Sequence, residues 1–155
     1  MVVRVLHNAN MGHLQTYLAK ANKYCDAKNI YGIESMPFHN WDQVEKEEIT
    51  TWVGQKIKGV QRRIITGERL MFVMYDIAPT VKFPPHSHPH EQIGCVLQGK
   101  IEFTLGNETK VLGPGDAYVI PPNVPHSSRG MGTETIKILD GFSPIREDFL
   151  KKAKP

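Results

Sequence analysis

From residue 50 onward, the sequence alternates short apolar runs with glycine- and proline-containing breaks, and this spacing constrains the fold most. The runs at 58–67 and 69–79 are rich in β-branched and aromatic residues, and the letters TGER between them suit a turn. Further short runs follow at 92–112, 117–122 and 134–142. Many short strands at close spacing predict an all-β sandwich or barrel.

The segment 100–105 (KIEFTL) shows the expected burial pattern most clearly. Ile101, Phe103 and Leu105 alternate with polar or charged residues. Side chains two apart in a strand face the same way, so this period predicts a strand with one buried face.

The chain has a different character before residue 50. Apolar residues recur there at helical spacing, which predicts a helix containing Leu14, Tyr17, Leu18, Ala21 and Cys25. We therefore expect a short, partly helical N-terminal extension over 1–50 and a β domain over 51–155. At the other end, Ser143 as N-cap and Pro144 at the first helical position predict a short terminal turn or helix.

Composition limits the classes of partner. A chain of 155 residues suits one domain, and no apolar run is long enough to span a bilayer. The first ten residues lack the pattern of a signal peptide, so we expect a cytoplasmic protein. The net charge of +3 comes mainly from the tail KKAKP, which gives no reason to expect nucleic acid as a partner. The two cysteines, Cys25 and Cys95, argue against a structural disulfide.

The sequence HSHPHEQ, residues 86–92, concentrates the chemistry. If this stretch is a regular strand, the alternate side chains share one face, namely His86, His88, His90 and Gln92. Glu91 would then face the opposite side. Imidazoles spaced in this way can converge on one ion, provided that another strand supplies a further ligand.

His126 is the candidate for that further ligand. It follows a predicted strand and a proline-containing turn in IPPNVPHSS, and the preceding proline favours an extended approach. Each histidine alone would suit a surface loop, but their combination favours a metal site. Imidazole ligands suit several ions, so the cofactor is one divalent transition metal ion among zinc, nickel, manganese, iron and copper.

These residues lie in two stretches, PPHSHPHEQIGCVLQG and GPGDAYVIPPNVPH, that resemble the two signature motifs of the cupin superfamily. His86, His88, Gln92 and Gly99 match the first motif, and the second runs from Pro114-Gly115 to His126. The resemblance covers residues 55–150. It implies a double-stranded β-helix, or jelly-roll barrel, that holds a metal bound by His86, His88, Gln92 and His126.

Gln92 departs from the glutamate that is usual at its position in the family. Its amide oxygen is neutral, so three imidazoles and an amide leave the charge of a divalent ion undiminished. Such a centre would be a stronger Lewis acid, would favour an anionic substrate, and would hold its metal less tightly. His90 matches no ligand position, and contact with substrate, hydrogen bonding to a ligand and simple packing all stay open for it.

The stretch LDGFSPIREDF resembles the end of KdgF-type cupins, which linearise the unsaturated uronates released by pectin and alginate lyases. The resemblance places Asp140, Phe142 and Arg146 at the metal pocket. It implies Asp140 as general acid or base, Arg146 as the partner of a substrate carboxylate, and Phe142 against the sugar. Taken singly, these residues suit a turn cap, a core position and a charged helix face equally well.

The resemblance thus implies an enzyme of the isomerase or lyase type that acts on a small anionic sugar acid. Two other functions stay open: a cupin dioxygenase acting on an aromatic or diketone substrate, and a non-catalytic cupin that binds a small ligand. The resemblance also implies a homodimer. The stretch 49–59 (ITTWVGQKIKG) is typical of an edge strand able to pair with another chain, and Trp52 within it suits packing.

Overall fold

The structure, a computed structural model, describes residues 38–150 of the chain. The chain divides into two compact units, the second of which begins at Glu45. In the described part of the first unit, residues 38–44, a 3-10 helix η2 (Trp41–Gln43) is capped by Asn40, whose side chain accepts a hydrogen bond from the Asp42 N–H (2.9 Å). The expected helix around residues 14–25 lies outside the described residues, and the boundary at residue 50 stays a prediction.

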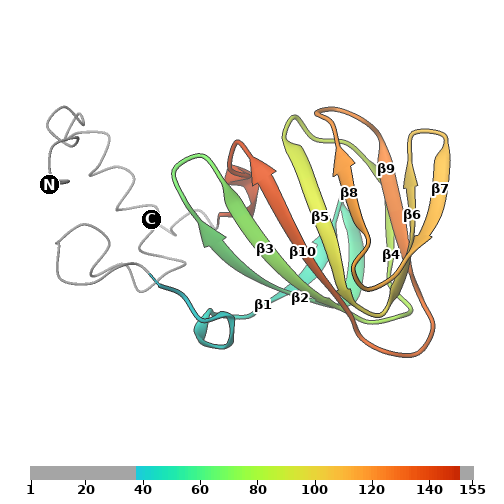
Figure 1. The fold of residues 1–155 in the computed structure, drawn as a ribbon, viewed down its shortest axis with the longest axis horizontal. Coiled ribbons are helices and arrows are strands. Elements are labelled where there is room, and N and C mark those ends of the chain that lie inside the picture. Colours follow the sequence, from blue (N-terminus) through green and yellow to red (C-terminus); the bar gives the residue numbers. More distant parts are fainter. Residues whose placement is uncertain (1–37, 151–155) are drawn as a thin grey trace, which may run out of the picture. The chain divides into compact units, whose positions relative to one another are not determined.

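Within residues 45–150, the second unit contains two antiparallel sheets and one short 3-10 helix, which confirms the all-β expectation (Figure 1). The six-stranded sheet has the order β1 (Glu47–Trp52), β2 (Gln55–Thr66), β3 (Met71–Ile77), β10 (Ile136–Ser143), β5 (Glu91–Gln98) and β8 (Ala117–Ile120). The four-stranded sheet has the order β4 (Lys82–His86), β9 (His126–Met131), β6 (Lys100–Leu105) and β7 (Glu108–Leu112). The 3-10 helix is η3 (Glu147–Phe149).

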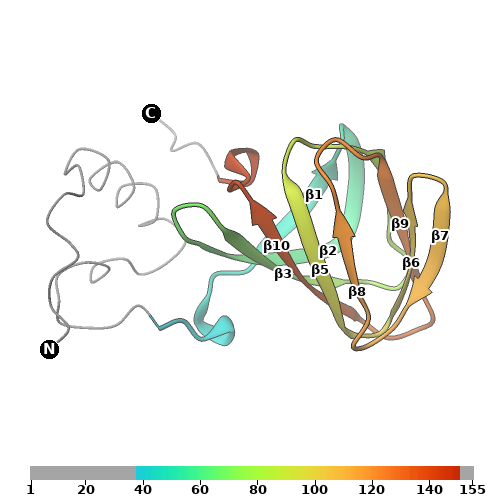
Figure 2. The ribbon, with the colours of Figure 1, turned by 45° about the horizontal axis from the view of Figure 1, so that its top comes forward.

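The two sheets pack face to face, as the turned view in Figure 2 shows, and enclose the core between them. Strand β10 lies between β3 and β5, and every second residue along it is buried. Along β6, Ile101 and Phe103 are buried and Leu105 is half-buried, in line with the expected period of two. Strand β10 therefore carries alternate side chains into the middle of the sandwich.

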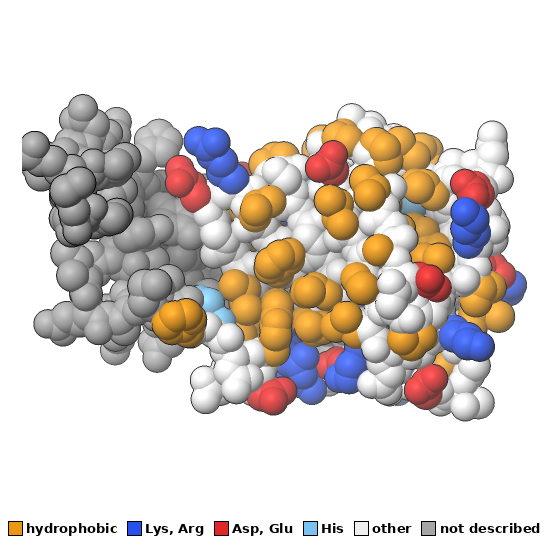
Figure 3. Space-filling model, viewed as in Figure 1, with side chains coloured by type: hydrophobic (Ala, Val, Ile, Leu, Met, Phe, Trp, Pro, Cys, Tyr) orange, Lys and Arg blue, Asp and Glu red, His pale blue; other side chains and the backbone are white. Residues whose placement is uncertain are grey.

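The outer face of the six-stranded sheet is unusually apolar. Phe72, Ile93, Leu97 and Val119 are 45–53% exposed, and Figure 3 shows hydrophobic side chains gathered over this face. Three of them form a row across the strands, because Gly141 pairs with both Phe72 and Ile93 and Ile93 pairs with Val119. We call Phe72, Ile93, Leu97 and Val119 the outer apolar patch.

The expected turn at TGER is confirmed, because the Gly67 N–H donates to the Leu70 carbonyl (2.7 Å) between β2 and β3. The interpretation of 49–59 as one edge strand is wrong. Val53 and Gly54 both have positive φ, 48° and 74°, and turn the chain into a hairpin. Two consecutive residues of this kind suit a tight hairpin turn. The first arm, β1, does form an edge of the sheet.

The expected short terminal turn or helix is present as η3, but its expected start at Ser143 is wrong. Ser143 pairs with Glu91 as the last residue of β10, so its backbone belongs to the sheet and cannot cap a helix. The helical turn begins only at Glu147, with Arg146 at the N-cap position. Within residues 38–150, no helix is long and apolar enough to cross a membrane.

Candidate metal centre

The three candidate histidine ligands come from two neighbouring strands and the loop after one of them. His86 is the last residue of β4, and its partner in the ladder is His126, the first residue of β9. The expectation of one regular strand from His86 to Gln92 is wrong, because residues 87–90 form a loop that leads to β5. Proline cannot donate to a sheet ladder, so Pro89 opposes strand pairing here. The loop is held instead by the Asn123 N–H, which donates to the His88 carbonyl (2.8 Å).

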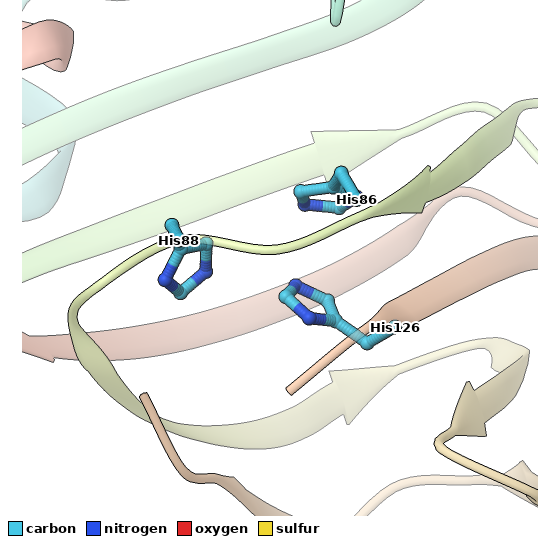
Figure 4. Close-up of side chains that lie close together, drawn as sticks. All are labelled: His86, His88 and His126. Carbon is cyan, nitrogen blue, oxygen red and sulfur yellow. The ribbon is translucent and has the colours of Figure 1, made fainter. Parts of the chain in front are cut away.

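The loop nevertheless brings His88 to the other two histidines. One ring nitrogen from each of His86, His88 and His126 lies within 4.8 Å of those from the other two. Figure 4 shows the three rings turned toward a common space. The ring centres of His86 and His126 are 4.2 Å apart, and those of His88 and His126 are 5.0 Å apart. His88 and His126 are buried, and His86 is half-buried.

Each of these rings is oriented by a hydrogen bond from its Nδ1 atom to a backbone carbonyl. The partners are Pro84 for His86 (2.9 Å), His90 for His88 (3.1 Å) and Val124 for His126 (2.9 Å). A carbonyl oxygen can only accept, so Nδ1 must carry the proton in all three rings. Every Nε2 atom therefore keeps its lone pair in the neutral ring, which is the state that binds a metal ion.

Burial keeps the three rings uncharged. It lowers the pKa of His86 and of His88 to about 4 in each case, and it also lowers the pKa of His126. The positive charge of Arg146 acts in the same direction on all three. The three imidazole rings therefore stay neutral as the pH falls well below 7.

Gln92 is buried, and its Oε1 atom lies 3.1 Å from Nε2 of His88. With the ring protonated on Nδ1, both of these atoms are acceptors. Two atoms about 2.1 Å from one ion lie roughly 3 Å apart when their bonds meet near a right angle, so the spacing fits two ligands of one metal. The amide nitrogen is engaged elsewhere, because Gln92 hydrogen-bonds Asp140 and a carboxylate needs a donor. The donor set therefore fits a divalent transition metal ion.

Glu91 and His90, the two residues before Gln92, both stay outside the group of candidate ligands. Glu91 is exposed, which confirms that it faces away from the other ligand candidates. His90 is half-buried, and its ring centre lies 5.6 Å from that of His88. It stands outside the group of three rings and contributes its carbonyl to orient His88. A substrate contact by its side chain stays a prediction.

Asp140 is buried on the inner face of β10, next to this centre. The Tyr118 hydroxyl donates to Asp140 Oδ1 at 2.6 Å, and Gln92 donates as well. Burial raises the pKa of Asp140 to about 6, although both hydrogen bonds and the charge of Arg146 oppose this rise. A carboxyl group with such a pKa can exchange protons near neutral pH.

Gly94 creates the space in which Tyr118 and Asp140 meet. On β5 it pairs with Asp140 of β10 on one side and with Tyr118 of β8 on the other. A Cβ atom at this position would overlap the Tyr118 ring and the Asp140 carboxylate. The hydrogen bond between Tyr118 and Asp140 thus passes directly over Gly94, which has no side chain.

Arg146 is held in place by aromatic rings and an acid. Its guanidinium group lies 4.0 Å from the ring centre of Phe149 and 5.4 Å from that of Phe142. Its Nε and Nη2 atoms donate to the Asp148 carboxylate at 3.2 and 2.6 Å. Arg146 is only 8% exposed, and Phe142 is fully buried with its ring 5.7 Å from that of His88. The sequence-predicted residues Asp140, Phe142 and Arg146 therefore all lie beside the three histidines.

Two cavities that share part of their walls lie at this end of the sandwich. The inner cavity is lined by His86, His126 and Gln92 together with Asp140, Phe142 and Arg146, and additionally by Trp52, Tyr75, Phe103 and Tyr118. A larger outer cavity of about 460 Å³ is lined by β1, Arg62, His86, Ser87, Arg146, Asp148 and Phe149. Trp52, His86 and Arg146 line both cavities. The outer cavity has the size of a small-molecule site.

Tyr75, Tyr118 and Arg62 also belong to this region, although no sequence motif predicts them there. Tyr118 lies two residues before the buried Ile120 within the second motif, so the period of two could have placed it on the inner face. Tyr75 sits among apolar strand residues and Arg62 lies between Gln61 and Arg63, so neither gave a signal of its own. Their proximity follows from the pairing of β2 with β3, in which Arg62 is the partner of Tyr75.

Comparison with known proteins assigns the chain to a family. The model of the cupin domain matches residues 73–142. A pectin degradation protein, KdgF, from Dickeya dadantii is 36% identical over 94 residues, which cover 59% of this chain and 84% of that protein. This chain is a cupin. The matched residues contain His86, His88 and Gln92 of the first motif, and also His126 and Asp140.

Two solved structures agree with this assignment. KdgF from a Halomonas species is 37% identical, with a TM-score of 0.56 over 59% of this chain and 84% of that one. An RmlC-like cupin from Shewanella frigidimarina is 30% identical, with a TM-score of 0.64 over 74% of this chain and 96% of that one. The resemblance to the KdgF type is therefore confirmed in both sequence and fold.

The Gly94 position generates the first prediction. Replacing Gly94 by alanine should separate Tyr118 from Asp140 and disturb Gln92, because the added methyl group occupies their space. We expect a loss of about 1–3 kcal/mol in the free energy of unfolding, measured by denaturant titration, together with weaker metal binding. Gly113→Ala is the matched control, since its Cβ would meet only Asp116 at an ordinary distance of 4.0 Å. Equal behaviour of the two variants would show that the space over Gly94 is not needed.

The lowered pKa values of the histidines predict how metal binding depends on pH. Protons compete with a metal only below the pKa of the free ligand, and these values lie near 4 for His86 and His88 rather than near 6.5. We expect zinc affinity, measured by calorimetry, to change little between pH 8 and about 6 and to fall as the pH approaches the lowered values. A steep loss centred on the pKa of free histidine would contradict this expectation.

Proposed function

We propose that this cupin converts cyclic unsaturated uronates into linear ketonised sugars. The observation that carries the proposal is the position of Asp140: its carboxyl group, with a pKa raised to about 6, is hydrogen-bonded to the candidate ligand Gln92. A proton-exchanging group thus lies beside a set of neutral ligands that would hold a Lewis-acidic ion. The similarity to KdgF proteins, one of which is named for pectin degradation, supports the same reaction class.

In this proposal His86, His88, His126 and Gln92 hold one divalent ion, whether zinc, nickel, manganese, iron or copper. When bound, the ion supplies positive charge that stabilises negative charge developing on substrate oxygens. Because all four ligands are neutral, none of that charge is offset by the protein. The ligand set therefore favours an anionic substrate.

Arg146 is the proposed partner of the substrate carboxylate. Its guanidinium group reaches both cavities, and Asp148 and two aromatic rings fix its plane. A guanidinium group held in this way keeps further N–H groups for a planar carboxylate. Phe142 packs beside Arg146 and would close the apolar side of the sugar.

Asp140 is the proposed general acid and base. As a carboxylate it takes the proton of the anomeric hydroxyl, the bond between the anomeric carbon and the ring oxygen breaks, and an aldehyde and an enol oxygen form. Return of one proton to the carbon at the far end of the enol gives the keto acid. Substrate and product are isomers, so no other reactant is consumed. The Tyr118 hydroxyl and the Gln92 amide keep the Asp140 carboxylate oriented throughout.

Replacing Asp140 by asparagine tests this role. The variant keeps the size of the side chain but cannot exchange the proton, so we expect turnover to fall by about 10²-fold or more while bound zinc is retained. Turnover is followed as loss of the absorbance of the conjugated double bond of an unsaturated galacturonate, and metal content by elemental analysis. Full activity in this variant would rule out the proposed role.

Assays of the wild-type protein also distinguish the proposed reaction from the other functions that the sequence left open. Oxygen uptake with an aromatic or diketone substrate, without reaction of any unsaturated uronate, would identify a dioxygenase. Tight binding of a sugar acid without turnover would identify a non-catalytic binding protein. Each result would contradict the proposed isomerisation while leaving the cupin fold unaffected.

We also propose a homodimer that buries the outer apolar patch. Its members project from the outer face of β3, β5 and β8, and an exposed apolar area on one sheet face is typical of a protein interface. A second copy of the chain offers the same surface, so two patches can pack together about a two-fold axis.

Replacing Ile93 by lysine should convert the dimer to a monomer, because it places a charge within the buried patch. The control is Val111→Lys on β7 of the other sheet, where the side chain is equally exposed at 52%. Sedimentation equilibrium measures the mass of each variant. A monomeric wild-type protein, or a dimer that is unaffected by the lysine at position 93, would contradict the proposal.

A further inference from the structure

Three buried polar side-chain atoms without a hydrogen-bond partner lie near the candidate metal centre in the described part of the chain. Among the described residues, four buried side-chain atoms lack a hydrogen-bond partner: Trp52 Nε1, Arg63 Nε, the Tyr75 hydroxyl and His90 Nδ1. Trp52 and Tyr75 line the inner cavity, and His90 lies next to His88. Since most buried polar groups in proteins are paired, this clustering points to a ligand that completes them.

Tyr75 is the most enclosed of these groups. It lies on the inner face of β3 and is only 4% exposed, so its hydroxyl cannot be satisfied by bulk water. The hydroxyl needs an acceptor for its proton. Arg62, its partner across the ladder, acts on the phenol oxygen as a hydrogen-bond donor, so it cannot accept the hydroxyl proton.

Asp140 is the acidic group that acts on Tyr75, but it is already engaged. The negative charge of Asp140 contributes to raising the pKa of Tyr75, after burial, so the two groups lie near each other. The Asp140 carboxylate, however, accepts from Tyr118 at 2.6 Å and from Gln92. No hydrogen bond from Tyr75 reaches either carboxylate oxygen, so Tyr75 keeps a free donor in the wall of the inner cavity.

Packing does not account for this hydroxyl. A phenylalanine would fill the same space between the sheets without leaving a donor unpaired, and an unpaired buried donor lowers the stability of the ligand-free protein. A buried donor that lowers the stability of the ligand-free protein has a physical reason to be present if it forms a hydrogen bond to a bound ligand. The inner cavity that Tyr75 shares with His86, Asp140 and Arg146 has a volume of about 40 Å³, so it would take one oxygen-bearing end of such a ligand, and the rest of the ligand would lie in the outer cavity.

We propose that the Tyr75 hydroxyl donates a hydrogen bond to an oxygen atom of the bound sugar acid and so determines the specificity of the site for oxygen-rich ligands. The inference rests on the proposed function, because it takes the ligand to be a uronate. Arg146 holds the carboxylate, and Tyr75 binds a hydroxyl or ring oxygen of the same molecule. A ligand lacking that oxygen is rejected, because the hydroxyl then stays unpaired.

The test compares Tyr75→Phe with Tyr118→Phe in the zinc-loaded full-length protein. Calorimetric titration with D-galacturonate, a saturated uronate without the reactive double bond, measures binding separately from turnover. We expect Tyr75→Phe to weaken binding about tenfold. Its melting temperature without ligand should equal or exceed that of the wild type, since an unpaired donor is removed.

Tyr118→Phe is the matched control, because its hydroxyl is paired. Loss of that hydroxyl deprives the buried Asp140 of a donor, so we expect a lower melting temperature. The contrast in stability separates a ligand donor from a structural one. Unchanged galacturonate binding by Tyr75→Phe, or a fall in its ligand-free melting temperature like that of Tyr118→Phe, would overturn the proposal.

The experiment also separates this inference from the proposed function. If the wild type binds galacturonate but does not consume an unsaturated uronate, the proposed reaction fails. The ratio of the galacturonate affinities of the wild type and Tyr75→Phe then still decides the role of Tyr75. If the wild type does not bind galacturonate at all, the proposed role of Tyr75 fails. If Tyr75→Phe binds tenfold more weakly, the role of Tyr75 is supported whatever the turnover.

Discussion

The hydrogen bond between Gln92 and Asp140 is the interaction on which the rest of the site depends. It fixes the amide nitrogen toward the carboxylate and leaves the amide oxygen beside His88 Nε2, at 3.1 Å. A glutamate at position 92 would place two carboxylates against each other in a buried space, where like charges oppose ionisation of both. The choice of glutamine thus serves two purposes: it offers a neutral ligand and it supports a buried acid.

The same interaction explains the arrangement of three strands. Gln92 and Gly94 follow each other on the inner face of β5, with Asp140 on one side and Tyr118 on the other. Glycine is required where two large side chains of neighbouring strands meet above the strand between them. The pairing of β8, β5 and β10 therefore positions the proton-exchanging Asp140. The loop at 87–90 carries His88 to the same place.

Burial then sets the charge state of the whole centre. It lowers the pKa values of the histidines and raises that of Asp140, so both kinds of group favour their neutral forms. Arg146 stays charged, paired with the Asp148 carboxylate and flanked by the rings of Phe142 and Phe149. A neutral ligand set beside one fixed cation is suited to an anion, in agreement with the preference inferred from Gln92.

The sequence by itself determined the all-β class and the identity of the candidate ligands. Alternation within strands and breaks at glycine and proline are local properties, and the spacing of His86, His88, Gln92 and His126 is legible without a structure. It was misleading where local pattern competes with pairing across strands. The prolines turned the expected histidine strand into a loop, Val53 and Gly54 turned the expected edge strand into a hairpin, and pairing with Glu91 kept Ser143 in the sheet. Only the tertiary structure decided which nitrogen of each ring is free, that Gly94 makes room for Tyr118 and Asp140, and that Tyr75 lacks an acceptor, because these depend on contacts between residues far apart in the chain.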